Sequence, residues 1–207
     1  MSTATPGAVT KLTTADEFWE FVHRPEHESR SFHLIRGTVV EDARPERPHG
    51  VVVARLGSFL EEYARHVRFG YVVTASGVIL ARNPATVLGP DVAYFTDANK
   101  FEDMHPKWGE VPPVLAVEIS SPNDRPGRMN AKIQEYLTNG VKVVWQIDYE
   151  ERNVTVYRPN KTMEVVRESD ELTGGDDLPG LVIKVADIFK LPGDRHPPPP
   201  TSPPPAT

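Results

Sequence analysis

Three residues of this chain combine types and positions suited to metal-dependent chemistry: Asp91, Glu118 and Lys132. Asp91 opens an apolar run, residues 91–95, directly after a Gly-Pro pair, and Glu118 lies within a second run, residues 114–119. Strands rich in Val, Leu and Ile are rigid supports, so acids on them can be fixed at the short separation that a hard divalent cation requires. The pattern therefore indicates two carboxylates and an ammonium held on neighbouring elements.

Glu118 is the more informative of the two acids. It interrupts a run that is apolar enough to be buried on both faces of a sheet. A buried ionised glutamate is costly unless a cation or strong hydrogen-bond donors accompany it. Periodicity alone leaves two interpretations open, a functional acid or a structural ion pair with an arginine.

Lys132 borders the apolar stripe of its predicted helix, three residues after Met129 and four before Tyr136. Its aliphatic stem can run along the packed surface and deliver the ammonium toward the strand that carries Glu118. The alternative is an ordinary surface lysine that forms a solvated basic face with Arg125 and Arg128.

The helices that would position these groups can be predicted from capping and spacing. Thr14 and Glu17 have the spacing of a capping box, which predicts a short helix just after Thr14. Apolar residues of 49–67 recur every three or four positions, as on one face of an amphipathic helix. A third helix is predicted from Pro126 to a stop at Asn139-Gly140.

Strands are predicted where apolar, β-branched or aromatic runs are bounded by Gly, Pro or polar residues. The predicted strands are 32–41 with a bend at Gly37, 71–80, 91–95 and 114–119 in one sheet, a hairpin of 141–148 with 153–157, and short strands at 163–167 and 181–185. The polar segment 96–111 is predicted to be a loop.

The chain has 207 residues, 39% of them apolar, which suffices for one substantial core. We therefore expect a flexible N-terminus over residues 1–11, a single domain over 12–191 and a disordered proline-rich tail over 192–207.

No apolar run reaches about 18 residues and no signal sequence is recognisable, so no membrane partner and a cytoplasmic location are expected. The lack of cysteine restricts metal ligands to oxygen and imidazole. The net charge of −6 argues against a general basic field for nucleic acid.

Other site types are less well supported. His23 and His27 are four residues apart, as zinc ligands on a helix can be, but Pro25 between them favours a polar loop. His49 could touch the site or a phosphate, or serve as a surface or capping histidine. The motifs of the nucleophile elbow, the P-loop and the dinucleotide-binding loop are missing from the sequence.

Taken together, the motifs resemble the Uma family of putative restriction endonucleases, within the PD-(D/E)XK nuclease superfamily. The likeness extends from about residue 12 to 191, and its block from Val117 to Asp148 is quite specific. The motifs that carry it are Phe32-His-Leu-Ile-Arg-Gly, His49, Gly89-Pro-Asp-Val-Ala, Leu115-Ala-Val-Glu-Ile-Ser-Ser-Pro, Asp124, Lys132, Tyr136, Gly140-Val and Val144-Trp-Gln-Ile-Asp.

The resemblance implies an α/β fold with a restriction-endonuclease-like core, in which a mixed β-sheet is flanked by helices. It also implies a homodimer and metal-dependent phosphodiester hydrolysis of DNA with Mg²⁺ or Mn²⁺. Carried over to this chain, Asp91 and Glu118 are the metal ligands. Ser120 stands where the superfamily pattern has lysine, so Lys132 would take that role.

His33 is a second departure, because family members commonly have glutamate at this position. The change could remove a metal ligand, or replace it with an imidazole that would favour Mn²⁺ over Mg²⁺. Two further hypotheses therefore stay open beside the DNA endonuclease. One is a catalytically silent binding or assembly module with the nuclease fold, and the other is a metal-dependent hydrolase of another small phosphoester.

Overall fold

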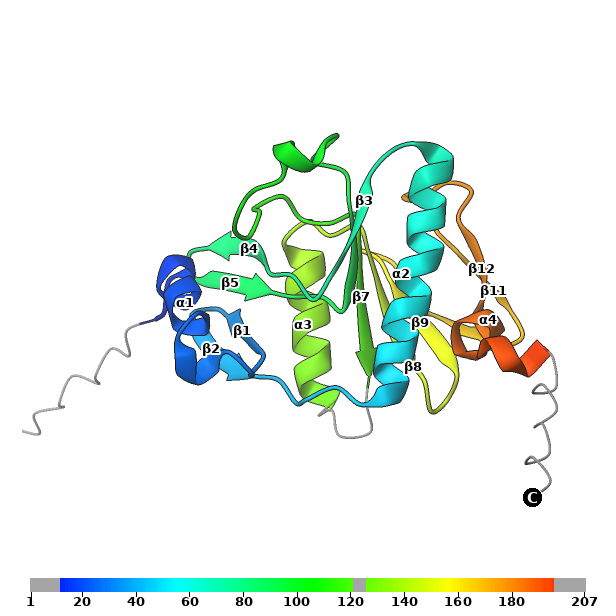
Figure 1. Cartoon of the computed structure of the whole chain (residues 1–207), viewed down its shortest axis with the longest axis horizontal. Coiled ribbons are helices and arrows are strands. Elements are labelled where there is room, and N and C mark those ends of the chain that lie inside the picture. Colours follow the sequence, from blue (N-terminus) through cyan, green and yellow to red (C-terminus); the bar gives the residue numbers. More distant parts are fainter. Residues whose placement is uncertain (1–11, 121–125, 196–207) are drawn as a thin grey trace, which may run out of the picture.

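The computed structural model describes residues 12–120 and 126–195, which form three β-sheets with helices between and around them (Figure 1). The helices are α1 (Ala15–Val22), α2 (Arg47–Val67), α3 (Pro126–Thr138) and α4 (Val185–Phe189), with short 3-10 helices η1 (Pro25–His27), η2 (Phe101–Asp103) and η3 (Pro192–Arg195). The strands are β1 (Phe32–Ile35), β2 (Thr38–Glu41), β3 (Tyr71–Thr74), β4 (Val78–Arg82), β5 (Ala85–Leu88), β6 (Val92–Phe95), β7 (Leu115–Ser120), β8 (Val143–Asp148), β9 (Asn153–Tyr157), β10 (Glu164–Arg167), β11 (Glu171–Thr173) and β12 (Val182–Lys184).

The central sheet is six-stranded and mixed, in the order β10-β9-β8-β7-β6-β3. β7 and β8 run parallel and are connected through α3, whereas the other neighbouring strands are antiparallel. β8 and β9 form the predicted hairpin. The α/β architecture with a mixed sheet flanked by helices is confirmed.

The two faces of β7 have different partners because successive side chains of a strand point to opposite faces. Leu115, Val117 and Ile119 belong to the larger core, together with the buried apolar face of α2. Ala116 instead packs in a second cluster with α3. α2 and α3 lie on opposite sides of β7 in Figure 1. Each large side chain fully buried in these cores contributes about 1.5–3 kcal/mol, so both helices are held firmly against the strand.

The four-stranded sheet, in the order β2-β1-β5-β4, lies on the side of α3 that faces away from the central sheet. Ile35, Leu80 and Leu88 of this sheet pack in the same cluster as the buried residues of α3. The buried carboxylate of Glu135 also accepts a hydrogen bond from Nε of Arg36 at 2.6 Å, which links α3 to the β1–β2 turn. Polar residues of α3 are therefore held between two sheets.

Two predicted strands are wrong because each is broken by left-handed backbone. Residues 32–41 form the hairpin β1–β2, whose turn residues Arg36 and Gly37 have φ of 47° and 78°. Residues 71–80 divide between β3 in the central sheet and β4 in the four-stranded sheet. The division follows Ala75, whose φ is 50°. An L-residue rarely adopts such angles, and neither turn has a distinctive sequence signal beyond its glycines. β5 and β11 were not predicted.

The predicted domain limits are not tested by the structure. Within the described residues the fold continues from residue 12 to η3, and residues 1–11 and 196–207 lie outside them. Among the described helices, none combines the length and the apolar character needed to cross a membrane.

Candidate active site

Asp91 lies close to the strand that carries Glu118 in the central sheet. β6 pairs antiparallel with β7 so that Val92 is opposite Val117 and Ala93 is opposite Ala116. Asp91 directly precedes β6, and its carboxylate accepts a hydrogen bond from the backbone N–H of Ile119, the residue after Glu118. The two acids are thus neighbours, and the negative charge of Asp91 contributes to the raised pKa of Glu118.

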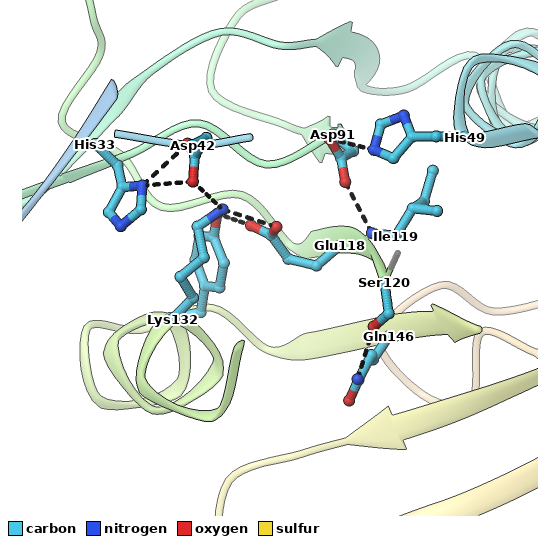
Figure 2. Close-up of polar contacts among 10 residues, drawn as sticks. His33, Asp42, His49, Asp91, Glu118, Ile119, Ser120, Lys132 and Gln146 are labelled. Atoms are coloured by element: carbon cyan, nitrogen blue, oxygen red, sulfur yellow. Dashed lines mark hydrogen bonds and ion pairs between the residues drawn. The ribbon is translucent and has the colours of Figure 1, made fainter. Parts of the chain in front are cut away.

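Glu118 is almost completely buried, with 2% of its surface exposed. Its Oε1 accepts a hydrogen bond from the hydroxyl of Tyr136 at 2.7 Å, and its Oε2 accepts one from Nζ of Lys132 at 3.0 Å (Figure 2). Burial raises the pKa of Glu118 to about 7, assisted by the negative charge of Asp91, while Lys132 and Tyr136 lower it in part. Glu118 is therefore in an ion pair, as one of the two interpretations predicts, but its cationic partner is a lysine and not an arginine.

Lys132 projects from α3 into the site, and only 12% of its side chain is exposed. Its ammonium also lies 4.0 Å from Oδ1 of Asp42. Burial disfavours the charged form of Lys132, but the carboxylates of Glu118 and Asp42 outweigh this effect and raise its pKa above the usual value. Lys132 is therefore a charged and mostly buried residue of the candidate site, and the alternative of an ordinary surface lysine is wrong. Arg128 is exposed, as a solvated face predicts, and Arg125 lies outside the described residues.

Asp91 is fixed by two donors. Its Oδ2 accepts a hydrogen bond from the backbone N–H of Ile119 at 2.8 Å, which ties it to β7. Its Oδ1 lies 3.1 Å from Nε2 of His49, close to the start of α2. Of the two interpretations of His49, contact with the site is the one the structure supports. Asp91 has 24% of its side chain exposed, so this carboxylate is the more accessible of the pair.

His33 and Asp42 form a second contact on the other side of Lys132 (Figure 2). Nδ1 of the buried His33 lies 2.9 Å from Oδ1 and 3.0 Å from Oδ2 of Asp42. Partial burial raises the pKa of Asp42, but His33 and the charge of Lys132 lower it more, so the net shift is downward. The structure thus gives His33 a carboxylate partner away from Asp91, and its role as a metal ligand stays a prediction.

Asp42 was missed by the sequence reasoning. It follows β2 in a charged, mostly exposed segment that offers no periodic or motif signal. Only the β1–β2 hairpin and the packing of α3 bring it to Lys132. The single available signal is its place at the end of a strand, which is too common to single out one acid.

Ser120 also has a side-chain partner on the same part of the sheet. Its Oγ accepts a hydrogen bond from Nε2 of Gln146 at 2.8 Å, and Oε1 of Gln146 accepts one from the hydroxyl of Tyr157 at 2.9 Å. Gln146 lies beside Glu118 in the parallel register of β7 and β8. Ser120, at the position where the superfamily pattern has lysine, is therefore part of a series of hydrogen bonds between neutral side chains.

The donor chemistry of Asp91 and Glu118 fits a hard cation with few protein ligands. Among the described residues, no group of three His, Asp or Glu side chains is placed to hold a metal ion. Magnesium, however, is commonly bound by one or two carboxylates, with water and phosphate oxygens completing its coordination. Asp124, which the resemblance also includes, lies outside the described residues.

The fold and the family both place this chain among nuclease-like proteins. The crystal structure of a putative nuclease belonging to DUF820 from Anabaena variabilis matches with a TM-score of 0.73 and 21% identity, over 85% of this chain and 97% of that chain. The family model Uma2, described as a putative restriction endonuclease, matches residues 18–186. The chain therefore belongs to the Uma2 family. No curated protein matches the chain. Family and fold together support a nuclease function in general.

Proposed function

We propose that this chain is a metal-dependent endonuclease that hydrolyses phosphodiester bonds in DNA. One observation carries the proposal beyond family membership. Two carboxylates, Glu118 on β7 and Asp91 just before the neighbouring β6, lie close enough for the charge of Asp91 to raise the pKa of Glu118, and a charged lysine lies 3.0 Å from Glu118. Acids that would repel each other when ionised, beside a buried cation, are typical of functional sites.

Asp91 and Glu118 would hold Mg²⁺ or Mn²⁺ in this proposal. Such an ion polarises a phosphoryl oxygen and lowers the pKa of bound water. Lys132 keeps its proton because its pKa is raised, so it orients the attacking water and offsets charge that develops on the phosphate rather than acting as a base. His49 and Tyr136 hold the two carboxylates in place. No covalent intermediate is needed.

The proposed partners follow from the family and not from a visible surface. DNA is the proposed substrate, and a second copy of the chain is the proposed partner in a homodimer. The net charge of −6 means that affinity for DNA must come from local contacts and from the bound cation, because the chain lacks an overall positive field.

A cleavage assay tests the proposal with supercoiled and single-stranded DNA in Mg²⁺ or Mn²⁺. Asp91→Asn, Glu118→Gln and Lys132→Met should each lower the rate by about 100-fold or more. Glu164→Gln and Lys142→Met remove equivalent charges from exposed positions outside the site and should cleave like the unmodified chain. Thermal melting of every variant separates loss of chemistry from loss of fold. Unchanged cleavage in both acid variants, or no cleavage with either metal, contradicts the proposal.

A second candidate is a catalytically silent module with the nuclease fold. It is favoured by the fact that all four oxygens of Asp91 and Glu118 already have protein partners: Ile119, His49, Tyr136 and Lys132. Calorimetric titration with Mn²⁺ distinguishes the two candidates. If the chain is a silent module, it should show no Mn²⁺ binding that depends on Glu118, so Glu118→Gln should leave the titration unchanged.

A further inference from the structure

Lys132 has a second carboxylate within reach that the proposed mechanism does not use. Its Nζ lies 3.0 Å from Oε2 of Glu118 and 4.0 Å from Oδ1 of Asp42. The two acids come from different sheets: Glu118 is on β7, and Asp42 follows β2. Figure 2 shows both carboxylates directed at the same ammonium. The distance from Lys132 to Asp42 is thus only 1.0 Å longer than its distance to Glu118.

Asp42 is built into the fold as an acceptor of fixed orientation. The imidazole of His33, with 4% of its side chain exposed, contacts both oxygens of the Asp42 carboxylate. His33 is itself anchored on β1, opposite Val40 of β2. A surface acid with no such support would lose side-chain entropy on pairing with a lysine, whereas Asp42 is already ordered.

Glu118 cannot bind Lys132 and a divalent cation equally well at the same time. Its carboxylate is 2% exposed, and one of its two oxygens is taken by Tyr136. An ammonium and a divalent cation on the remaining oxygen would repel each other strongly in a poorly solvated site. A cation can therefore bind Glu118 well only if Lys132 has another acceptor that keeps its charge balanced.

We propose that Asp42 is this second acceptor, so that the Lys132 ammonium passes from Glu118 to Asp42 when Glu118 binds a divalent cation. The inference rests on the proposed function, and it makes Asp42 a positioning residue that acts through Lys132. His33 then serves the site by holding Asp42. In this exchange one ion pair of Lys132 replaces another, and a Glu118 that carries a proton releases it to solvent when the cation binds.

The test is calorimetric titration of the folded chain with Mn²⁺ in the absence of DNA. Asp42→Asn removes the charge of the second acceptor and should weaken Mn²⁺ binding by about 10-fold. Lys132→Met removes the competing ammonium, so in this background Asp42→Asn should change the affinity by less than about twofold. Asp42→Ser removes the same charge with a smaller side chain and should behave like Asp42→Asn.

Glu41→Gln is the matched control, because it removes an acid adjacent to Asp42 that pairs with Arg30 outside the site. Its Mn²⁺ affinity should equal that of the unmodified chain. Equal affinity in Asp42→Asn overturns the inference and leaves the proposed function intact. A loss that persists in the Lys132→Met background also overturns it, because Asp42 would then act independently of Lys132. Absence of Mn²⁺ binding in the unmodified chain overturns both the inference and the metal-dependent function.

Discussion

Glu118 is the residue on which the chemistry of the site depends. It lies inside an apolar strand next to Asp91, and among the described residues Lys132 and Tyr136 donate hydrogen bonds that compensate for its buried charge. Burial nevertheless prevails and raises its pKa to about 7. A carboxyl group poised near neutrality can exchange a proton for a cation at little cost. The same property makes the site sensitive to pH.

The stability of the chain should fall as the pH rises from about 4.5 to about 7 because of Glu118. In this window the unfolded chain releases the proton of Glu118 and the folded chain retains it, so the free energy of unfolding decreases by roughly 3 kcal/mol at most. Below the window both states are protonated, and the contribution is fully present. Urea unfolding at several pH values measures the effect against Glu118→Gln, which does not titrate. Identical pH profiles for the two chains would refute this prediction.

Tyr136→Phe should raise the pKa of Glu118 further. The hydroxyl of Tyr136 donates to Oε1 of Glu118 at 2.7 Å and stabilises the charged form, so its removal favours the neutral acid. Titration of the carboxyl carbon by NMR, with labelled glutamate, gives the pKa directly. Tyr157→Phe is the control, because that hydroxyl donates to Gln146 instead. A pKa that is unchanged or lower in Tyr136→Phe would show that the hydrogen bond does not stabilise the carboxylate.

At the scale of elements, α3 determines whether the site assembles. Its buried face packs between the two sheets, and the same helix delivers Lys132 and Tyr136 to Glu118. The segment ends near Gly140, which has φ of 100° and so lies in a region that L side chains rarely adopt. The stop at Gly140 thus sets where α3 turns back toward β8.

Gly140→Ala should destabilise the chain by about 1 kcal/mol or more, because alanine is strained at this backbone angle. The contact of an added Cβ with Pro112 at 3.4 Å is ordinary, so the cost is conformational and not steric. Gly57→Ala is the matched comparison: it lies inside α2, where an added Cβ meets open space, and should stabilise by up to about 1 kcal/mol. Chemical unfolding measures both changes. Equal effects of the two substitutions would show that the backbone angle of Gly140 is not limiting.

Several elements could be predicted from sequence because their signals are local. The capping box of Thr14 and Glu17 is present, α2 begins two residues before the predicted 49–67, and the stop at Asn139-Gly140 is where α3 ends. The failures are turns that need tertiary context. The break after Ala75 sends consecutive strands to different sheets, and no periodicity distinguishes that from one longer strand.

At the scale of the whole molecule, the site exists because distant segments meet. That Asp91 and Glu118 lie close together depends on the pairing of β6 with β7, which a sequence does not specify. Of the partners, Asp42 directly follows β2 of the four-stranded sheet, and His49 lies in the first turn of α2. The acid pair and Lys132 could be singled out by type and by resemblance to a family, but Asp42 could not, because only folding gives it a partner.

The overall charge predicts that DNA binding depends on a divalent cation. The chain carries −6, and the acids of the site add local repulsion toward phosphate that a bound cation reverses. Affinity for a DNA duplex, measured by fluorescence anisotropy at fixed salt, should be about 10-fold higher in Ca²⁺ than in EDTA. Asp91→Asn should lose most of this difference. Equal affinity in Ca²⁺ and EDTA would mean that the cation does not mediate contact with phosphate.

The central claim is that Asp91 and Glu118 jointly bind one divalent cation. Anomalous diffraction from a crystal soaked in Mn²⁺ tests it most directly, because the metal is located without reference to activity. We predict a single strong peak between the two carboxylates, with Lys132 turned toward Asp42. A crystal that takes up Mn²⁺ elsewhere, or that shows Glu118 still bound to Lys132 and Tyr136 with no peak beside Asp91, would contradict the claim.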